Sequence, residues 1–349
     1  MLAAVLAASL LIPAIAAAPV RGGNDNPRRA LDGYAAMQRY LFDARSGSYR
    51  DAVGARPGAH AWPVSQALAA TIAVANTPHA SSRMKKAVSA RLARIEAFRT
   101  GAVYAAWPGG NVYWDDNEWL AQDLLAAGHV AGIRRAREIF AAVVHAWDND
   151  ASRPCAGGVQ WTEAPGNDDR NTVSTVNGAL VGLELYARTR SPDVLRWSQR
   201  MLDWVDACML ADDGLTWDHI DRLGNIDTRH WSYNEGSLIA SLVLLARETH
   251  DAAPIARAEA LADRALTYYD ARWSEEPPEF ASIFFVNLLR LADADGRNDY
   301  VTEAQRYADE AWVSHRDSRT GLYAFGQATR LLDQAALVRL YATLARSGS

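Results

Sequence analysis

Six segments of the chain are apolar around nearly their whole helical circumference, and they recur at a fairly regular interval. They are residues 62–75, 114–128, 174–188, 231–247, 278–293 and 331–346. With Gln66, Asn117, Asn177, Asn234, Ala281 and Gln334 as markers, the steps are 51, 60, 57, 47 and 53 residues. A helix that is apolar on all sides must be covered on all sides, so we expect these six segments to form an inner set of helices.

Segments with a single apolar face alternate with the inner set. In one of them Val88, Leu92, Ile95 and Phe98 follow helical spacing, while lysine and arginine occupy the other faces. The segments of this kind are 28–43, 83–100, 132–148, 191–210, 254–272 and 299–314. The alternation predicts an all-α fold, an (α/α)6 toroid in which six inner helices lie within six outer helices.

The connections into the inner helices differ from those that leave them. Long stretches rich in Gly, Asn, Asp and Trp precede the inner segments, such as "AWPGGNVYWDDN" and "LTWDHIDRLGNIDTRHWSYNE". The opposite connections, such as "ANTPHASS" and "TRSPD", are short. Because the toroid places the N-terminal ends of all its inner helices at one rim, we expect the functional site at the rim that carries the long loops.

The composition narrows the class of ligand. The 36 basic and 41 acidic residues give a formal net charge of −5, and there is no basic run, so we expect no nucleic-acid partner. The 12 tryptophans and 13 tyrosines supply flat rings that can stack on the C–H faces of sugars. Two cysteines are too few for a zinc site, and we interpret the acidic pairs in "NDD" and "ADDG" as solvated turns rather than metal ligands.

The first residues resemble an export signal. Residues 1–18 combine an apolar run with a small-residue end, which is typical of a secretory signal peptide; an uncleaved anchor is the competing interpretation. We expect a single toroid domain over residues 19–349, no stable membrane insertion, and a secreted protein for which cell-envelope association stays open. In an oxidising compartment Cys155 and Cys208 either form one disulfide or remain two buried thiols, and the sequence leaves both open.

An adjacent pair of acids opens the second inner segment, in "VYWDDNEW". One aspartate at a helix start is explained as a cap, but two like charges in succession raise each other's cost of ionisation. Glycoside hydrolysis needs two carboxyl groups at one anomeric carbon, and a separation of about 5–5.5 Å favours retention. Neighbouring Cα atoms lie about 3.8 Å apart, so Asp115 and Asp116 can straddle a sugar at this shorter separation. Their repulsion would leave one protonated, as a general acid requires.

Four motifs resemble those of glycoside hydrolase family 76, the endo-α-1,6-mannanase family. They are "YWDDNEW", "GGVQW" (157–161), "WSYNEG" (231–236) and "LLDQAA" (331–336). The resemblance implies an (α/α)6 fold and retaining cleavage of α-1,6-linked mannan, with Asp115 as nucleophile and Asp116 as acid/base. Glu118 stands where the family commonly has a small residue, and Glu235 where glutamine is usual.

Further rim residues are candidates for binding the sugar. We expect the aromatic rings to form the floor of mannose subsites, and the amides and the remaining acid to form hydrogen bonds with sugar hydroxyls. These candidates are Trp114, Asn117, Trp161, Trp231, Tyr233, Asn234, Asp333 and Gln334. For each ring the alternative is simple packing between helix ends, and for the polar residues it is capping. No metal or organic cofactor is expected, because side chains supply both acid and nucleophile.

The sequence therefore predicts a monomeric, secreted endo-α-1,6-mannanase that acts on α-mannan or on a mannan-containing lipoglycan. A transglycosylase with the same aspartate pair remains an alternative, and so does a non-catalytic glycan-binding protein on the same fold. A sugar epimerase would need paired cavity histidines, for which His60 and His230 would have to serve.

Overall fold

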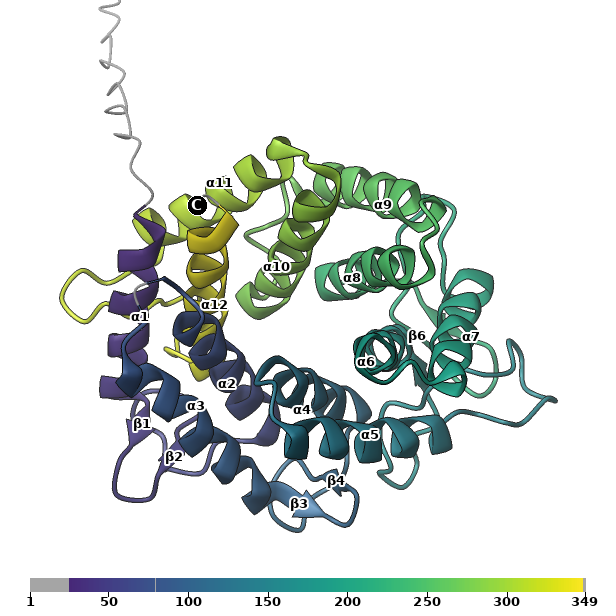
Figure 1. Cartoon of the computed structure of the whole chain (residues 1–349), viewed down its shortest axis with the longest axis horizontal. Helices are drawn as coiled ribbons and strands as arrows, with labels where there is room; N and C mark the ends of the chain where they lie inside the picture. The colour runs from purple at the N-terminus through teal and green to yellow at the C-terminus, as the bar shows by residue number, and fades with distance from the viewer. Residues whose placement is uncertain (1–24, 79, 348–349) are drawn as a thin grey trace, which may run out of the picture.

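A computed structural model describes residues 25–78 and 80–347 of the chain, and twelve α-helices dominate this part (Figure 1). In chain order they are α1 (Asn26–Tyr40), α2 (Ala61–Ala75), α3 (Ser82–Ile95), α4 (Trp114–Ala126), α5 (Val130–His145), α6 (Thr172–Thr189), α7 (Pro192–Cys208), α8 (Ser232–Thr249), α9 (Ala253–Tyr269), α10 (Pro278–Asp295), α11 (Asn298–Ser314) and α12 (Leu331–Ser347). The predicted segments coincide with these helices to within a few residues at most ends.

The even-numbered helices form a closed inner ring, and the odd-numbered helices lie around it (Figure 1). Each inner helix packs against the next, and α12 packs against α2 to close the ring. Each outer helix packs against at least one inner neighbour, for example α1 on α12 and α7 on α6. The predicted (α/α)6 toroid is confirmed.

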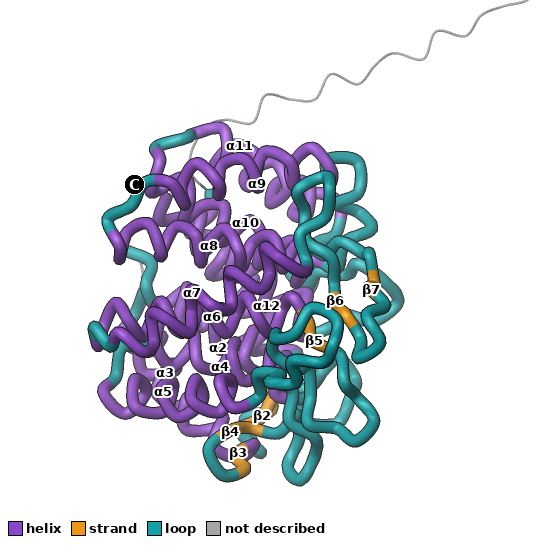
Figure 2. The backbone as a smooth tube through the Cα atoms, turned by 90° about the vertical axis from the view of Figure 1, so that its right-hand side faces the viewer, coloured by secondary structure: helices purple, strands orange, loops and turns teal. Residues whose placement is uncertain are grey.

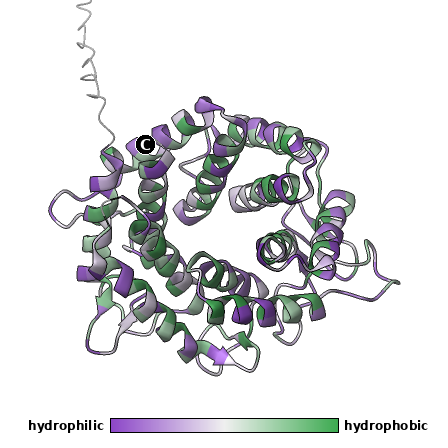
Figure 3. Ribbon diagram, in the orientation of Figure 1, coloured by the Kyte–Doolittle hydropathy of each residue, from purple (hydrophilic) through white to green (hydrophobic). Residues whose placement is uncertain are grey.

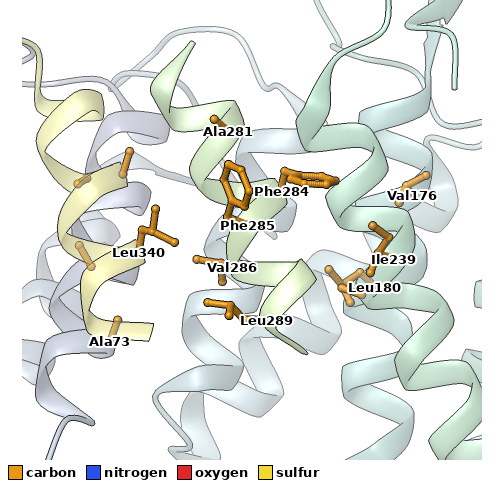
Figure 4. Packing of buried hydrophobic residues seen from close by; sticks show 14 of the residues in the cluster. Ala73, Val176, Leu180, Ile239, Ala281, Phe284, Phe285, Val286, Leu289 and Leu340 are labelled. Carbon is orange, nitrogen blue, oxygen red and sulfur yellow. The ribbon is translucent and has the colours of Figure 1, made fainter. Parts of the chain in front are cut away.

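Burial explains why the two kinds of helix take these places. In α6, Val176, Leu180 and Leu183 are all fully buried, because neighbours cover the inner helix from every direction. Figure 4 shows such side chains filling the space between inner helices. In α3 only Val88 and Ile95 are buried, so that this helix meets the ring along one stripe. Figure 3 shows the same contrast, with hydrophilic residues gathered on the outer helices.

Two inner helices approach each other at a glycine. A Cβ atom on Gly236 of α8 would lie 2.6 Å from the Cα atom of Phe284 in α10, closer than real side chains come. The absence of a side chain at this position lets the backbones of α8 and α10 pack directly.

The long loops gather at one end of the ring, together with seven short strands (Figure 2). These strands are β1 (Phe42–Asp43), β2 (Ser48–Tyr49), β3 (Arg99–Thr100), β4 (Val103–Tyr104), β5 (Arg170–Asn171), β6 (His219–Ile220) and β7 (Ile226–Asp227). They form the antiparallel pairs β1–β2 and β3–β4 and the antiparallel sheet β5–β6–β7. The helix expected over residues 83–100 is therefore too long, because a short 3₁₀ turn at Glu96–Phe98 ends it and the chain enters β3.

The two cysteines are joined. The Cys155–Cys208 disulfide, with Cα atoms 5.9 Å apart, links a rim loop to the last residue of α7. The proposed signal peptide at residues 1–18 lies outside the described residues. Among the helices that the structure describes, we find none both long and apolar enough to cross a membrane.

Candidate active site

A pocket of about 910 Å³ opens at the loop-bearing end of the ring. First-turn residues of the inner helices line its floor, among them Trp62 of α2, Asp115 and Asp116 of α4 and Tyr233 of α8. The loops that lead into α6 and α8 supply much of its wall. The volume lies within the range of about 300–1,000 Å³ that small-molecule sites usually have.

The two aspartates occupy the first turn of α4, which begins at Trp114. Asp115 is half-buried, and its Oδ2 atom accepts a hydrogen bond of 3.4 Å from the indole Nε1–H of Trp161. Asp116 is 9% exposed and faces the same pocket. The residue before the helix, Tyr113, provides no capping side chain, so the helix start leaves backbone N–H groups beside the acids.

Asp115 and Asp116 differ in pKa because their surroundings differ. Burial raises the pKa of Asp115 to about 6, although backbone N–H groups of the first turn and the Trp161 indole act in the opposite direction. Burial and then the negative charge of Asp115 raise the pKa of Asp116 well above its ordinary value. Because hydrogen bonds stabilise the ionised form of Asp115, and its negative charge acts on Asp116, Asp116 is the carboxyl that keeps the proton, while Asp115 ionises first.

Two groups of aromatic rings line the same pocket as the pair. Phe280 of α10 lies at the centre of one cluster, with ring centroids 4.0 Å from Tyr233, 5.5 Å from Trp231 and 6.0 Å from Trp62. In the second group Trp161 is 37% exposed, at a centroid distance of 5.1 Å from Tyr113. These walls offer stacking surfaces to a ligand that passes over the acids.

Half of the expected site residues line the pocket, namely Asp115, Asp116, Trp161, Trp231 and Tyr233. The others do not. Trp114 is 4% exposed and belongs to the hydrophobic core. Asn234 is fully buried beneath the rim. Asp333 is buried as well, and forms an ion pair with Arg330 at 2.5 Å.

Asn117 and Gln334 serve the backbone instead of a sugar, which corrects the expectation for both. The amide of Asn117 accepts from the N–H of Tyr104 at 2.7 Å and donates to its carbonyl at 2.8 Å. Gln334 makes the same pair of bonds to Tyr323, at 3.0 and 2.7 Å. Glu235 accepts from the N–H of Thr216 at 2.9 Å. These inner-helix side chains thus fasten the loop that precedes each helix.

Several residues of the pocket lining were missed by the sequence reasoning, and Trp62, Asp218 and Phe280 show why. Trp62 opens the first inner segment in "AWPVS", and its place in a helix's first turn was a usable signal. Asp218 belongs to a loop already assigned to the rim, but nothing in "TWDHID" separates it from its neighbours. Phe280 also occupies the first turn of an inner helix, but in an apolar segment the sequence does not distinguish a pocket ring from a core ring.

One group in the described part of the chain has the geometry of a metal site. Ligand atoms of Asp218, His219 and Asp227 lie within 4.8 Å of one another. The guanidinium of Arg229 already binds both carboxylate oxygens of Asp227, with bonds of 2.7–3.1 Å. Because Arg229 already neutralises Asp227 and the His219 imidazole already contacts Asp218, we assign no metal to the group.

The histidine pair that an epimerase would need is not assembled. His60 lines the pocket and contacts Asp51 at 2.8 Å, between His Nδ1 and Asp Oδ2. His230 is directed elsewhere, with Nδ1 at 2.8 Å from the carbonyl of Thr216 and its ring against Tyr268.

Comparison with known proteins places the chain among carbohydrate-active enzymes. A family model described as "Glycosyl hydrolase family 76" matches residues 30–276. A family 76 glycoside hydrolase (mannosidase) of Bacteroides thetaiotaomicron VPI-5482 superposes with a TM-score of 0.83 at 20% identity, over 92% of this chain and 98% of that one. An α-1,6-mannanase of Salegentibacter sp. HEL1_6 gives 0.79 at 18% identity, over 93% and 100%. At these identities the solved structures establish the fold alone.

The curated relatives match over a shorter stretch. The mannan endo-1,6-alpha-mannosidase DCW1 of Candida glabrata is 28% identical over 118 residues, which is 31% of this chain and 25% of that protein. The protein of the same name in Candida albicans is 29% identical over 132 residues, 35% of this chain and 28% of that protein. The match therefore spans only about a quarter of the length of these relatives.

An inactive variant of the Salegentibacter enzyme, with two aspartates replaced by asparagine, was solved with α-1,6-mannotriose.

Proposed function

Since the chain belongs to glycosyl hydrolase family 76, we propose that it is an exported endo-α-1,6-mannanase that cleaves its substrate with retention of configuration. Asp115 and Asp116 are the catalytic residues of this proposal. The observation that supports it most is their placement: two neighbouring carboxyls in the first turn of an inner helix, at the floor of an aromatic-walled pocket, with different proton affinities.

The reaction proceeds as a double displacement. Asp116, which holds the proton, donates it to the glycosidic oxygen as the bond to the anomeric carbon breaks. The Asp115 carboxylate attacks that carbon from the opposite face and forms a glycosyl ester. Asp116 is now ionised and takes a proton from water, whose oxygen attacks the anomeric carbon and releases Asp115. The second step restores both side chains, so no cofactor is consumed.

Surrounding groups support these roles. The indole N–H of Trp161 donates to Asp115 and favours its ionised form before attack. Trp161, Trp231 and Tyr233 line the pocket at positions where their rings can floor mannose units, and Trp62 and Phe280 extend the aromatic surface on one side.

The wider context of this proposal is a secreted monomer. Residues 1–18 act as an export signal and residues 19–349 form one catalytic domain, with no stable membrane insertion. The Cys155–Cys208 disulfide suits an oxidising compartment outside the cytoplasm. The substrate is an α-1,6-linked mannan, either free polysaccharide or the mannan of a lipoglycan. The fungal relatives are named mannan endo-1,6-alpha-mannosidases, in keeping with this substrate class.

Transglycosylation is the alternative that shares the first half of the mechanism. The glycosyl ester on Asp115 would then react with a sugar hydroxyl in place of water, in a pocket that is open to solvent. Addition of a short mannose acceptor distinguishes the two, because a transferase yields products longer than the acceptor and a hydrolase yields only shorter chains.

The test is cleavage of linear α-1,6-mannan with sizing of the products. We expect wild type to release short oligosaccharides, and Asp116→Asn to lose at least about 10²-fold in kcat, since acid–base groups typically contribute that much. Asp115→Asn should lose at least as much, because it removes the nucleophile that forms the glycosyl ester. Asp212→Asn is the matched control, because Asp212 belongs to an adjacent aspartate pair that lies exposed in a turn outside the pocket. A folded wild type that leaves this polymer intact would refute the assignment.

A further inference from the structure

A fully buried arginine joins two rim loops beside the active site. The guanidinium of Arg170 is 0% exposed and donates to four carbonyls. Three belong to the loop that leads into α6: Pro154 at 3.0 Å, Cys155 at 2.9 Å and Gly157 at 3.4 Å. The fourth is Asp221 at 2.9 Å, in the loop that leads into α8. Among the residues that the structure describes, no other side chain donates to backbone carbonyls of both these loops.

One of the carbonyls that Arg170 binds in the first loop belongs to a cysteine of the disulfide, Cys155. Cys155 has a φ angle of 53°, in the left-handed region that residues other than glycine seldom adopt. Its carbonyl accepts from Arg170 and also from the indole Nε1–H of Trp204 in α7, at 3.0 Å. The disulfide bond from Cys155 to Cys208 holds this residue against α7. The disulfide therefore also fixes the position of the carbonyl to which Arg170 donates.

Each loop carries a group that faces Asp115. In the first loop Trp161 donates its indole N–H to Asp115, and its backbone bonds to Asp169, the residue before Arg170, at 3.1 Å. In the second loop the negative charge of Asp218 acts on Asp115 across the pocket. The two loops also pair directly, since β5 (Arg170–Asn171) lies antiparallel to β6 (His219–Ile220).

We propose that Arg170, anchored by the Cys155–Cys208 disulfide, is a positioning residue that holds Trp161 and Asp218 at fixed places around Asp115. This role rests on the proposed function of Asp115. Arg170 itself is fully buried and is not part of the pocket lining. It acts by tying the two loops to each other and to α7.

Lysine cannot replace Arg170 in this role. A guanidinium presents five donors in a planar fork, which lets one side chain reach carbonyls on both loops, whereas an ammonium offers three donors at a single point. Arg170→Lys keeps the positive charge and the ion pair toward Asp148, 3.6 Å away, but loses some of the hydrogen bonds to the loop carbonyls. Arg153→Lys is the matched control, because Arg153 also pairs with Asp148, at 3.1 Å, and its ion pairs with Asp148 and Asp150 both lie within the first loop.

The first experiment compares these variants in steady-state kinetics over a range of pH. We expect Arg170→Lys to lower kcat by about tenfold to 10²-fold, the loss that a small misplacement of a reacting group brings. The acidic limb of kcat/KM should also move to higher pH, since weakening the Trp161 bond removes an interaction that lowers the pKa of Asp115. The negative charge of Asp218 raises that pKa, but it is the smaller of the two effects, so the direction is set by Trp161. Arg153→Lys should leave both unchanged. An unshifted limb in Arg170→Lys, or an equal effect in both variants, would overturn the role.

A second perturbation covers the case in which Arg170→Lys fails to fold. Cys155→Ser combined with Cys208→Ser removes the anchor without touching the guanidinium. We expect the same direction of change in kcat and in the acidic limb as for Arg170→Lys, with thermal unfolding still cooperative. A double-serine protein with wild-type kcat and pH profile would refute the anchoring role.

Hydrogen–deuterium exchange separates this inference from the proposed function. In Arg170→Lys, amides of residues 217–227 should exchange faster than in wild type, although the substitution lies in the other loop. If wild type does not cleave mannan but this exchange still rises, the function is wrong and the connection between the loops stands. If wild type cleaves mannan and Arg170→Lys matches it in rate and exchange, the connection alone is wrong.

Discussion

Replacement of Glu235 by glutamine should stabilise the protein in a manner that depends on pH. Glu235 is fully buried in the first turn of α8, where its Oε1 atom accepts the N–H of Thr216 and its Oε2 atom has no hydrogen-bond partner among the described residues. Burial raises its pKa from 4.5 to about 8. A neutral amide should be accepted here, since Gln334 of α12 already binds the N–H and carbonyl of Tyr323 in this way.

The magnitude follows from the shift in pKa. A folded-state pKa of about 8 against 4.5 when unfolded means that the folded protein binds the extra proton. The stability that this brings is complete below pH 4.5 and is lost as pH rises to about 8. The shift corresponds to at most about 5 kcal/mol at roughly 1.36 kcal/mol per pKa unit. For a chain of 349 residues, that is a difference of about 7 °C in Tm.

The assay is thermal unfolding followed by circular dichroism between pH 4.5 and pH 9. We expect the Tm of Glu235→Gln minus that of wild type to grow with pH and to level off above pH 8. Glu163→Gln is the control, because Glu163 is exposed and its replacement should give a small difference at every pH. A Glu235→Gln difference that stays constant across the range would refute the reasoning, because it would mean that Glu235 titrates alike in both states.

Other predictions concern catalysis and packing. The kcat/KM of wild type should fall below about pH 6 as Asp115 takes up a proton, and a rate that holds level down to pH 4 would contradict its role as nucleophile. Phe280→Ala should raise KM for mannan more than it lowers kcat, because it removes the ring against which the aromatic wall of the pocket packs; steady-state kinetics measures both. Gly236→Ala should lower the free energy of unfolding by about 1–3 kcal/mol, since its Cβ would meet the α10 backbone. Leu180→Ala should lower it by about 2–5 kcal/mol through the cavity it leaves in the core; urea unfolding measures both losses, and wild-type midpoints would contradict them.

The fold could be predicted from the sequence because the burial of a helix determines the spacing of its apolar residues. An inner helix such as α6 is apolar on every face, and an outer helix such as α3 on one stripe, so the order of the two kinds specifies the ring. The short strands left no such record. A pair of residues such as Val103–Tyr104 is too brief to show an alternating pattern, and it pairs with β3 only because the rim brings the two together.

The candidate site was predictable where chemistry requires a rare arrangement, and less so where one residue type serves two purposes. Adjacent acids beside tryptophans are uncommon, so Asp115 and Asp116 stood out from the sequence. An amide binds backbone and sugar equally well, so nothing local shows that Asn117 is turned toward Tyr104 rather than the pocket. The position of Arg170 was also hidden, because its partners come from residues up to 51 positions away.

The most direct test of the account is the configuration of the first sugar released from linear α-1,6-mannan, followed by proton NMR before the product equilibrates. If Asp115 forms a glycosyl ester and Asp116 supplies and recovers the proton, the new reducing end appears first as the α-anomer. A β-anomer as the first product would mean direct attack by water, and would contradict the double displacement at this pair of carboxyls.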